Sequence, residues 1–170
     1  MDTTTTSRFG RLRNNSISTV VFAVAIAAGG VSAFAGDSVN TGYFGGVAIM
    51  GYDPVAYFTD GKAVKGSEEF SYDWLGTPWH FASAKHREMF MSESLKYSPQ
   101  FGGYCAGEVV FGSVTINIDP EAFKILDGKL YLLYQKDAAT WLAENAGDVV
   151  PKATANWPKI KADLELDQYH

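Results

Sequence analysis

The chain has 170 residues, and its 19 acidic and 14 basic side chains give a formal net charge of −5. This acidic balance argues against nucleic acids and anionic membrane surfaces as partners, because both carry negative charge. The single cysteine, Cys105, excludes an internal disulfide. The length allows one domain with one core once an N-terminal segment is set aside.

The N-terminus predicts a secretory signal peptide over residues 1–35. Three arginines come first, then an apolar run that Gly29-Gly30 interrupts, then an A-x-A cleavage site: Arg8, Arg11, Arg13, residues 17–31 and Ala33-Phe34-Ala35. A permanent membrane span is the less favoured alternative, because the run is short. Sec-type cleavage after Ala35 would remove three arginines and Asp2, take the net charge from −5 to −7, and leave a periplasmic or secreted protein without a stable membrane anchor.

The rest of the chain divides into three predicted parts. Residues 36–46 are small and polar and predict a flexible lead-in. Residues 47–161 are rich in aromatic side chains and show no internal linker, which predicts one domain. Residues 162–170 lack an apolar pattern and predict a loose C-terminal tail.

A β-hairpin is predicted from two alternating runs, 70–74 and 79–82, with a turn over 75–78. With this turn, Trp74 lies opposite Trp79, Tyr72 lies opposite Phe81, and one face carries an aromatic core cluster. The same register places Asp73 opposite His80 on the other face.

The remaining elements predict an α+β fold, a small single domain in which two short antiparallel hairpins pack against a few helices. A helix capped by Ser83 is expected to run to about Pro99, with its apolar positions at Met89, Phe90 and Leu95. Further elements are a strand over 114–118, a hairpin over 125–134 around Asp127-Gly128, a helix over 137–145 and an interrupted helical piece over 151–162.

The sequence also contains a weak internal echo. Asp53-Pro54-Val55-Ala56-Tyr57 is followed by Asp60-Gly61-Lys62, and Asp119-Pro120-Glu121-Ala122-Phe123 is followed by Asp127-Gly128-Lys129. Asp-Pro favours a helix start and Asp-Gly favours a turn. Two convergent helical turns or one duplicated unit would each explain the pattern.

Three side chains are candidates for a metal site. Cys105 lies in the loop Gly102-Gly103-Tyr104-Cys105-Ala106, where glycines allow close approach. A thiolate is a soft ligand for copper or zinc and a nucleophile when its pKa is lowered, although free cysteine is also a common core residue. His86 is an alternative imidazole ligand or an ordinary helix residue. His80 could be held by Asp73 as a further ligand or could form an ordinary cross-strand pair.

These features together resemble the YHS domain, which is related to cysteine-based metal-binding modules. The resemblance rests on Asp53-Pro54-Val55, on Phe81-x-Ser83, on His86-Arg87-x-x-Phe90 and on the Gly-Gly-Tyr-Cys-Ala loop. The family pattern reads roughly D-P-V-C, then F-C-S-x-x-C-x-x-x-F, and its three cysteine positions are here Ala56, Ala82 and His86. The resemblance therefore implies an exported bacterial YHS protein that lacks the family's three-cysteine site.

Three functions follow as expectations. The first is a non-enzymatic exported module that binds copper or zinc through Cys105 and His86, with His80 or Met89 as a further partner. The second is a metal-free scaffold that binds a protein partner or a small ligand through aromatic surfaces. The third is a thiol-dependent enzyme that uses Cys105, disfavoured because no nucleophile elbow, P-loop or dinucleotide fingerprint is present.

Overall fold

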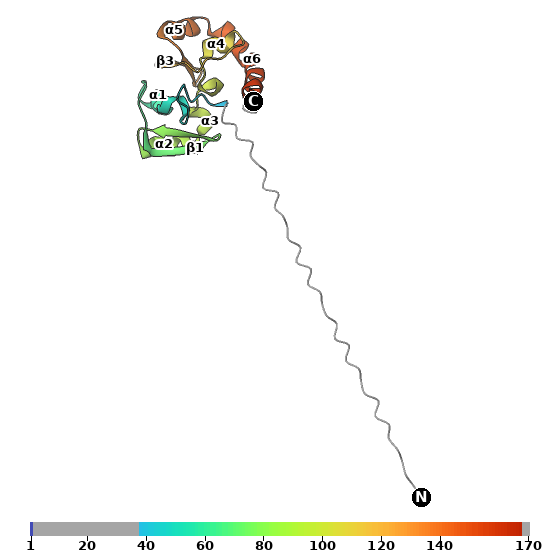
Figure 1. Cartoon of the computed structure of the whole chain (residues 1–170). Coiled ribbons are helices and arrows are strands. Elements are labelled where there is room, and N and C mark those ends of the chain that lie inside the picture. The colour runs from blue at the N-terminus through green and yellow to red at the C-terminus, as the bar shows by residue number, and fades with distance from the viewer. Residues whose placement is uncertain (2–37, 168–170) are drawn as a thin grey trace. The chain divides into compact units, whose positions relative to one another are not determined.

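The computed structural model describes Met1 and residues 38–167, with side chains as far as residue 164 (Figure 1). The predicted signal peptide and its cleavage site lie outside the described residues. Within the described part, none of the helices combines the length and the apolar character that crossing a bilayer requires.

Helices and two antiparallel hairpins follow one another along the chain, which confirms the predicted α+β class. The first set is η2 (Ala48–Gly51), α1 (Ala56–Thr59), β1 (Ser67–Trp74), β2 (Thr77–Phe81), α2 (Ala84–Ser92) and α3 (Ser94–Tyr97). The second set is η3 (Gln100–Gly103), α4 (Ala106–Val110), β3 (Asp119–Leu126), β4 (Lys129–Leu133), α5 (Lys136–Glu144) and α6 (Ala146–Asp167). In Figure 1 the first set runs from cyan to green and the second from yellow to red.

The two sets repeat one arrangement. The 3-10 turns, the hairpin strands and the helices that follow them are offset by 52 residues, as from Ser67 to Asp119, whereas α4 begins 50 residues after α1. Each hairpin has strands of 8 and 5 residues, a two-residue turn, and a two-residue link to a helix of 9 residues. Each also carries the same irregularity in its first strand, between Ser67 and Ser71 and between Asp119 and Phe123. We call residues 48–92 the first repeat and residues 100–144 the second repeat, and a residue's counterpart is the one 52 positions away.

The repeat differs from the echo predicted from Asp-Pro. Asp53-Pro54 lies just before α1, whereas Asp119-Pro120 begins strand β3, so these segments are not counterparts. The counterpart of Asp53 is Cys105. Alignment by backbone conformation reveals this, because Ile49 and Phe101 adopt the same left-handed conformation, with φ of 42° and 54°.

The first hairpin forms with the predicted faces but a different register. Leu75 and Gly76 have φ of 51° and 71° and make a two-residue turn, so Tyr72 pairs with Trp79 and Trp74 with Thr77. The predicted register is therefore wrong by two residues. A shift of two keeps each side chain on its face, because strand side chains alternate with period two.

The predicted aromatic cluster is confirmed. Trp79 packs against Trp74 with ring centroids 5.7 Å apart, and Phe90 of α2 lies between the hairpin rings. Phe90 contacts four of them, Tyr72, Trp74, Trp79 and Phe81. The Ser83 cap is also confirmed, since its hydroxyl accepts a hydrogen bond from the backbone N–H of His86 at 3.1 Å.

Both predicted chain ends need correction. Val39 and Asn40 are buried, and the Asn40 side-chain amide donates to the Gly103 carbonyl at 3.1 Å, so this part of the lead-in belongs to the domain, whereas residues 43–46 are exposed. Gly102 permits this, because a Cβ there would lie 1.8 Å from the Ser38 carbonyl oxygen. At the other end α6 continues to Asp167, and Leu164 packs against the core.

Three other elements of the structure differ from the prediction. Residues 114–118 form no strand. The helix from Ser83 breaks at Glu93, whose φ is −140°, and leaves Leu95 exposed. Helix α6 runs through Pro151 and Pro158, because Trp157 packs on Phe101 and tertiary packing overrides the local preference.

One buried hydroxyl joins the two repeats. Tyr57 of α1 donates a hydrogen bond to the Pro120 carbonyl of β3 at 3.0 Å, and its ring contacts Phe123. Burial raises the pKa of Tyr57 above its ordinary value of 10.0, so the hydroxyl stays protonated and remains a donor at neutral pH.

Candidate functional site

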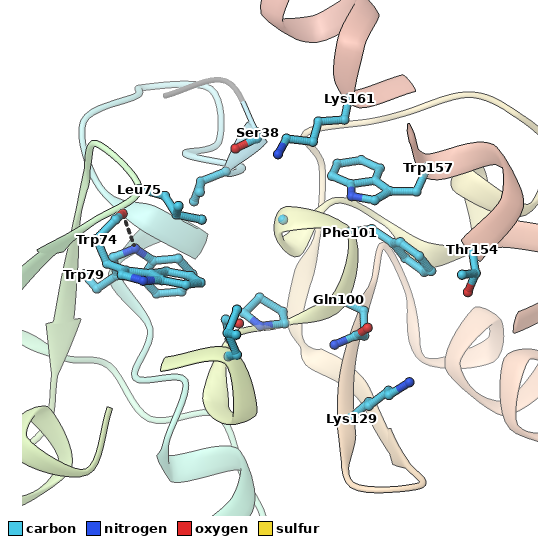
Figure 2. A pocket seen from close by; sticks show the side chains of 15 residues that line it. Ser38, Trp74, Leu75, Trp79, Gln100, Phe101, Lys129, Thr154, Trp157 and Lys161 are labelled. Carbon is cyan, nitrogen blue, oxygen red and sulfur yellow. Dashed lines mark hydrogen bonds between the residues drawn. The ribbon is translucent and has the colours of Figure 1, made fainter. Parts of the chain in front are cut away.

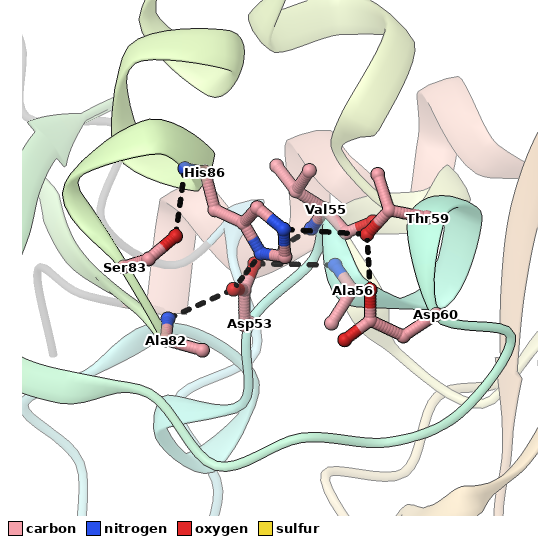
Figure 3. A network of polar contacts seen from close by, with 8 residues as sticks. All are labelled: Asp53, Val55, Ala56, Thr59, Asp60, Ala82, Ser83 and His86. Carbon is pink, nitrogen blue, oxygen red and sulfur yellow. Dashed lines mark hydrogen bonds and ion pairs between the residues drawn. The ribbon is translucent and has the colours of Figure 1, made fainter.

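The carboxylate of Asp53 is the centre of a buried polar network in the first repeat (Figure 3). Asp53 is fully buried. One carboxylate oxygen accepts the backbone N–H groups of Val55 at 2.8 Å and Ala56 at 3.3 Å. The other accepts the backbone N–H of Ala82 at 2.8 Å and the Nδ1–H of His86 at 2.6 Å. A carboxylate with four donors is fully satisfied without a ligand.

This network brings together the three positions that carry cysteine in the resembled family. Ala56, Ala82 and His86 all donate to Asp53, two through the backbone and one through the side chain. The turn after Asp53, the end of β2 and the first turn of α2 supply them. Alanine side chains provide no ligand atom, and in this chain the Asp53 carboxylate holds these three positions together.

Both ring nitrogens of His86 contact residues of this network. A carboxylate only accepts, so Nδ1 carries the proton that it shares with Asp53. Its other ring nitrogen, Nε2, lies 3.4 Å from the Thr59 hydroxyl oxygen. The side chain is 13% exposed. Its main role in this geometry is to hold the start of α2 against the Asp53 turn.

The predicted pair of His80 with Asp73 is wrong. Ser71 lies opposite His80 and Asp73 lies opposite Pro78, because the turn has two residues instead of four. His80 faces Gly51 instead, where an added Cβ would lie 3.5 Å from both His80 Nδ1 and Lys65 Nζ.

Cys105 lies in the second repeat, where it is 2% exposed. It precedes α4 and belongs to the wall of a cavity of about 380 Å³, which we call the Cys105 cavity. The wall is formed by Cys105, Gly107, Glu108, Phe111, Tyr134, Gln135, Asp137, Ala138 and Trp141. Neither His86 nor His80 is among these residues.

The Cys105 cavity and the Asp53 network occupy corresponding places in the two repeats. Cys105 is the counterpart of Asp53, Glu108 of Ala56, Tyr134 of Ala82 and Ala138 of His86. In the first repeat the imidazole of His86 reaches Asp53 across this space. In the second repeat Ala138 has only a methyl group, and the space is a cavity.

The wall of the Cys105 cavity combines aromatic rings with acidic groups. The rings of Phe111 and Trp141 stack at an interplanar angle of 18°, with centroids 6.1 Å apart. Among the described residues, Glu108 and Asp137 have no salt bridge, and no basic side chain contributes to the wall. The wall of the cavity therefore combines apolar surface with negative charge.

The candidate ligands Cys105 and His86 belong to different repeats. Within the described part of the chain, no group of three or more histidine, cysteine, aspartate or glutamate side chains is placed to hold a metal ion. His86 is hydrogen-bonded to Asp53 in the first repeat, and Cys105 belongs to the core of the second repeat. Met89 packs against the core.

A second cavity, of about 300 Å³, lies between elements of the two repeats and α6 (Figure 2). Trp74, Leu75 and Trp79 form one side, and Phe101 and Trp157 form the other. The Trp79 Nε1–H that borders it donates to the Trp74 carbonyl at 3.1 Å. The wall contains no cysteine or histidine, so it does not involve the predicted ligands.

The sequence analysis named Cys105 and His86 as candidates. It did not name Asp53 as an acceptor, nor Glu108, Asp137 and Trp141, which share the cavity wall with Cys105. The available signal was the dipeptide Gly-Tyr, which precedes Asp53 at 51–52 and Cys105 at 103–104.

Comparison with models of protein families, with curated proteins and with solved structures finds no match for this chain.

Proposed function

We propose that this chain is an exported, non-enzymatic binding module of the YHS type and that it binds a small ligand in the Cys105 cavity. One observation carries the proposal: the cavity replaces, in the second repeat, the contacts that fill the same place in the first. Its volume of about 380 Å³ falls within the range of small-molecule sites, and aromatic and polar groups share its wall.

The other parts of this proposal rest on the sequence and on the first repeat. Export is supported by the N-terminal pattern of arginines, apolar run and Ala33-Phe34-Ala35. YHS kinship is supported by the meeting of Ala56, Ala82 and His86 at one carboxylate, since positions that share a metal in relatives must lie close together.

Amide NMR of the protein, titrated with small aromatic compounds, tests the proposal. The probes are benzylamine, benzyl alcohol and benzoate, which share a benzene ring and differ in charge. At least one should shift the signals of Cys105, Glu108 and Ala138. Ala138→Leu should weaken or remove these shifts, because the larger side chain occupies part of the cavity. Thr140→Leu is the matched control, since Thr140 is exposed on the same helix and outside the wall. No localised shift from any probe, or equal shifts in Ala138→Leu, contradicts the proposal.

A soft metal ion is the second candidate ligand, because Cys105, whose thiolate is a soft ligand, belongs to the wall of the cavity. With His86 bonded to Asp53, we expect Cu(I) affinity to depend on Cys105 alone. Titration against a competing chelator should show loss of binding in Cys105→Ser and unchanged binding in His86→Ala. Equal loss in both variants would instead support the shared site predicted from the sequence.

A further inference from the structure

We infer that the ligand of the Cys105 cavity is a small organic cation, such as an alkylated ammonium compound. This inference rests on the proposed function and specifies its ligand class. It follows from the chemistry of the wall, which offers negative charge and aromatic surface and no positive charge.

The acidic groups supply charge complementarity. Glu108 of α4 is partly buried and Asp137 of α5 is exposed, and each lacks an ion-pair partner among the described residues. In the first repeat the corresponding residues are Ala56 and Lys85, so these two carboxylates are particular to the second repeat. A bound cation would interact favourably with both carboxylates, whereas an anion would be repelled.

The aromatic groups favour a cation that carries alkyl groups over a bare metal ion. Phe111, Tyr134 and Trp141 line the same cavity, and Phe111 and Tyr134 are exposed. The face of an aromatic ring attracts a cation, and the attraction is strongest for tryptophan. Alkyl groups on the cation also bury apolar surface against these rings. A bare metal ion gains little from the rings, and the described side chains provide no three-ligand group for it.

The test compares choline with 3,3-dimethylbutan-1-ol, a neutral isostere in which carbon replaces the quaternary nitrogen. Titration of the wild-type protein, followed by amide NMR at low salt, should give a dissociation constant at least about tenfold lower for choline. The difference should shrink as salt is added, because ions screen the exposed carboxylate.

Matched variants identify the groups responsible. Glu108→Gln and Asp137→Asn should each weaken choline binding and leave binding of the neutral isostere unchanged. Glu68→Gln removes an exposed acid from the first repeat and should change neither. Trp141→Leu should weaken choline more than the isostere. Equal binding of the two ligands, or choline binding that both acidic variants leave unchanged, overturns the cation inference, as does an absence of choline binding. If benzyl alcohol or benzoate still binds in the cavity, only the cation inference fails; if all probes fail, the proposed function fails with it.

Discussion

Replacing Trp79 by alanine should lower the free energy of unfolding by about 3–5 kcal/mol, the usual cost of removing a large buried aromatic side chain. Trp79 is 1% exposed and stacks on Phe90 with ring centroids 5.2 Å apart. Its indole N–H also donates to the Trp74 carbonyl, so the substitution removes a hydrogen bond as well as packing. Urea denaturation followed by circular dichroism measures the loss.

A matched control separates this effect from a general sensitivity to alanine. Leu95 is a large apolar side chain but is 83% exposed, so Leu95→Ala should change the free energy of unfolding by less than about 0.5 kcal/mol. A loss below about 1 kcal/mol for Trp79→Ala would show that the hairpin cluster is not the core of the first repeat.

Replacing Asp53 by alanine should cost a similar amount, about 3–5 kcal/mol, because it leaves several buried hydrogen-bond donors without their acceptor. Three backbone N–H groups, of Val55, Ala56 and Ala82, lose their acceptor together with the His86 ring. His86→Ala should cost less, about 1–2 kcal/mol, since Asp53 keeps its three backbone donors.

The double variant and an exposed control complete this comparison. If His86 acts only through Asp53, the costs of the two substitutions should not add, and the double variant should be about as stable as Asp53→Ala alone. Asp60→Ala, at an exposed carboxylate close to the same network, should cost less than about 0.5 kcal/mol. Full additivity of Asp53→Ala and His86→Ala would show that the imidazole stabilises the fold by another route.

The alternation of apolar and polar residues predicted much of the fold, because a small error in strand register does not change which face a side chain occupies. The hairpin faces were predicted correctly although the register was shifted, since a shift of two residues preserves the alternation. The turn itself was misread because Leu75 adopts a left-handed conformation that its residue type rarely takes, whereas its counterpart turn, Asp127-Gly128, carries a familiar signal.

The site was harder to predict because it depends on contacts between distant segments. Nothing in the sequence spacing shows that His86 bonds Asp53, 33 residues away, and not a group near Cys105. The repeat was hidden because backbone conformation, more than residue type, is what its halves share. Cys105 is the counterpart of Asp53, and Ala138 is the counterpart of His86. Because the second repeat has alanine where the first has histidine, a cavity lies beside the thiol.

Alkylation of Cys105 in the native protein tests most directly whether this cavity is an accessible site. Iodoacetamide reacts with the thiolate, and the extent of reaction is read by mass spectrometry. In wild-type protein under native conditions we expect complete reaction through the cavity. In Ala138→Leu we expect a rate at least about tenfold lower, and in Thr140→Leu an unchanged rate. Reaction of wild-type protein only when it unfolds, at a rate that Ala138→Leu does not lower, would contradict the account and show that Cys105 is a sealed core residue.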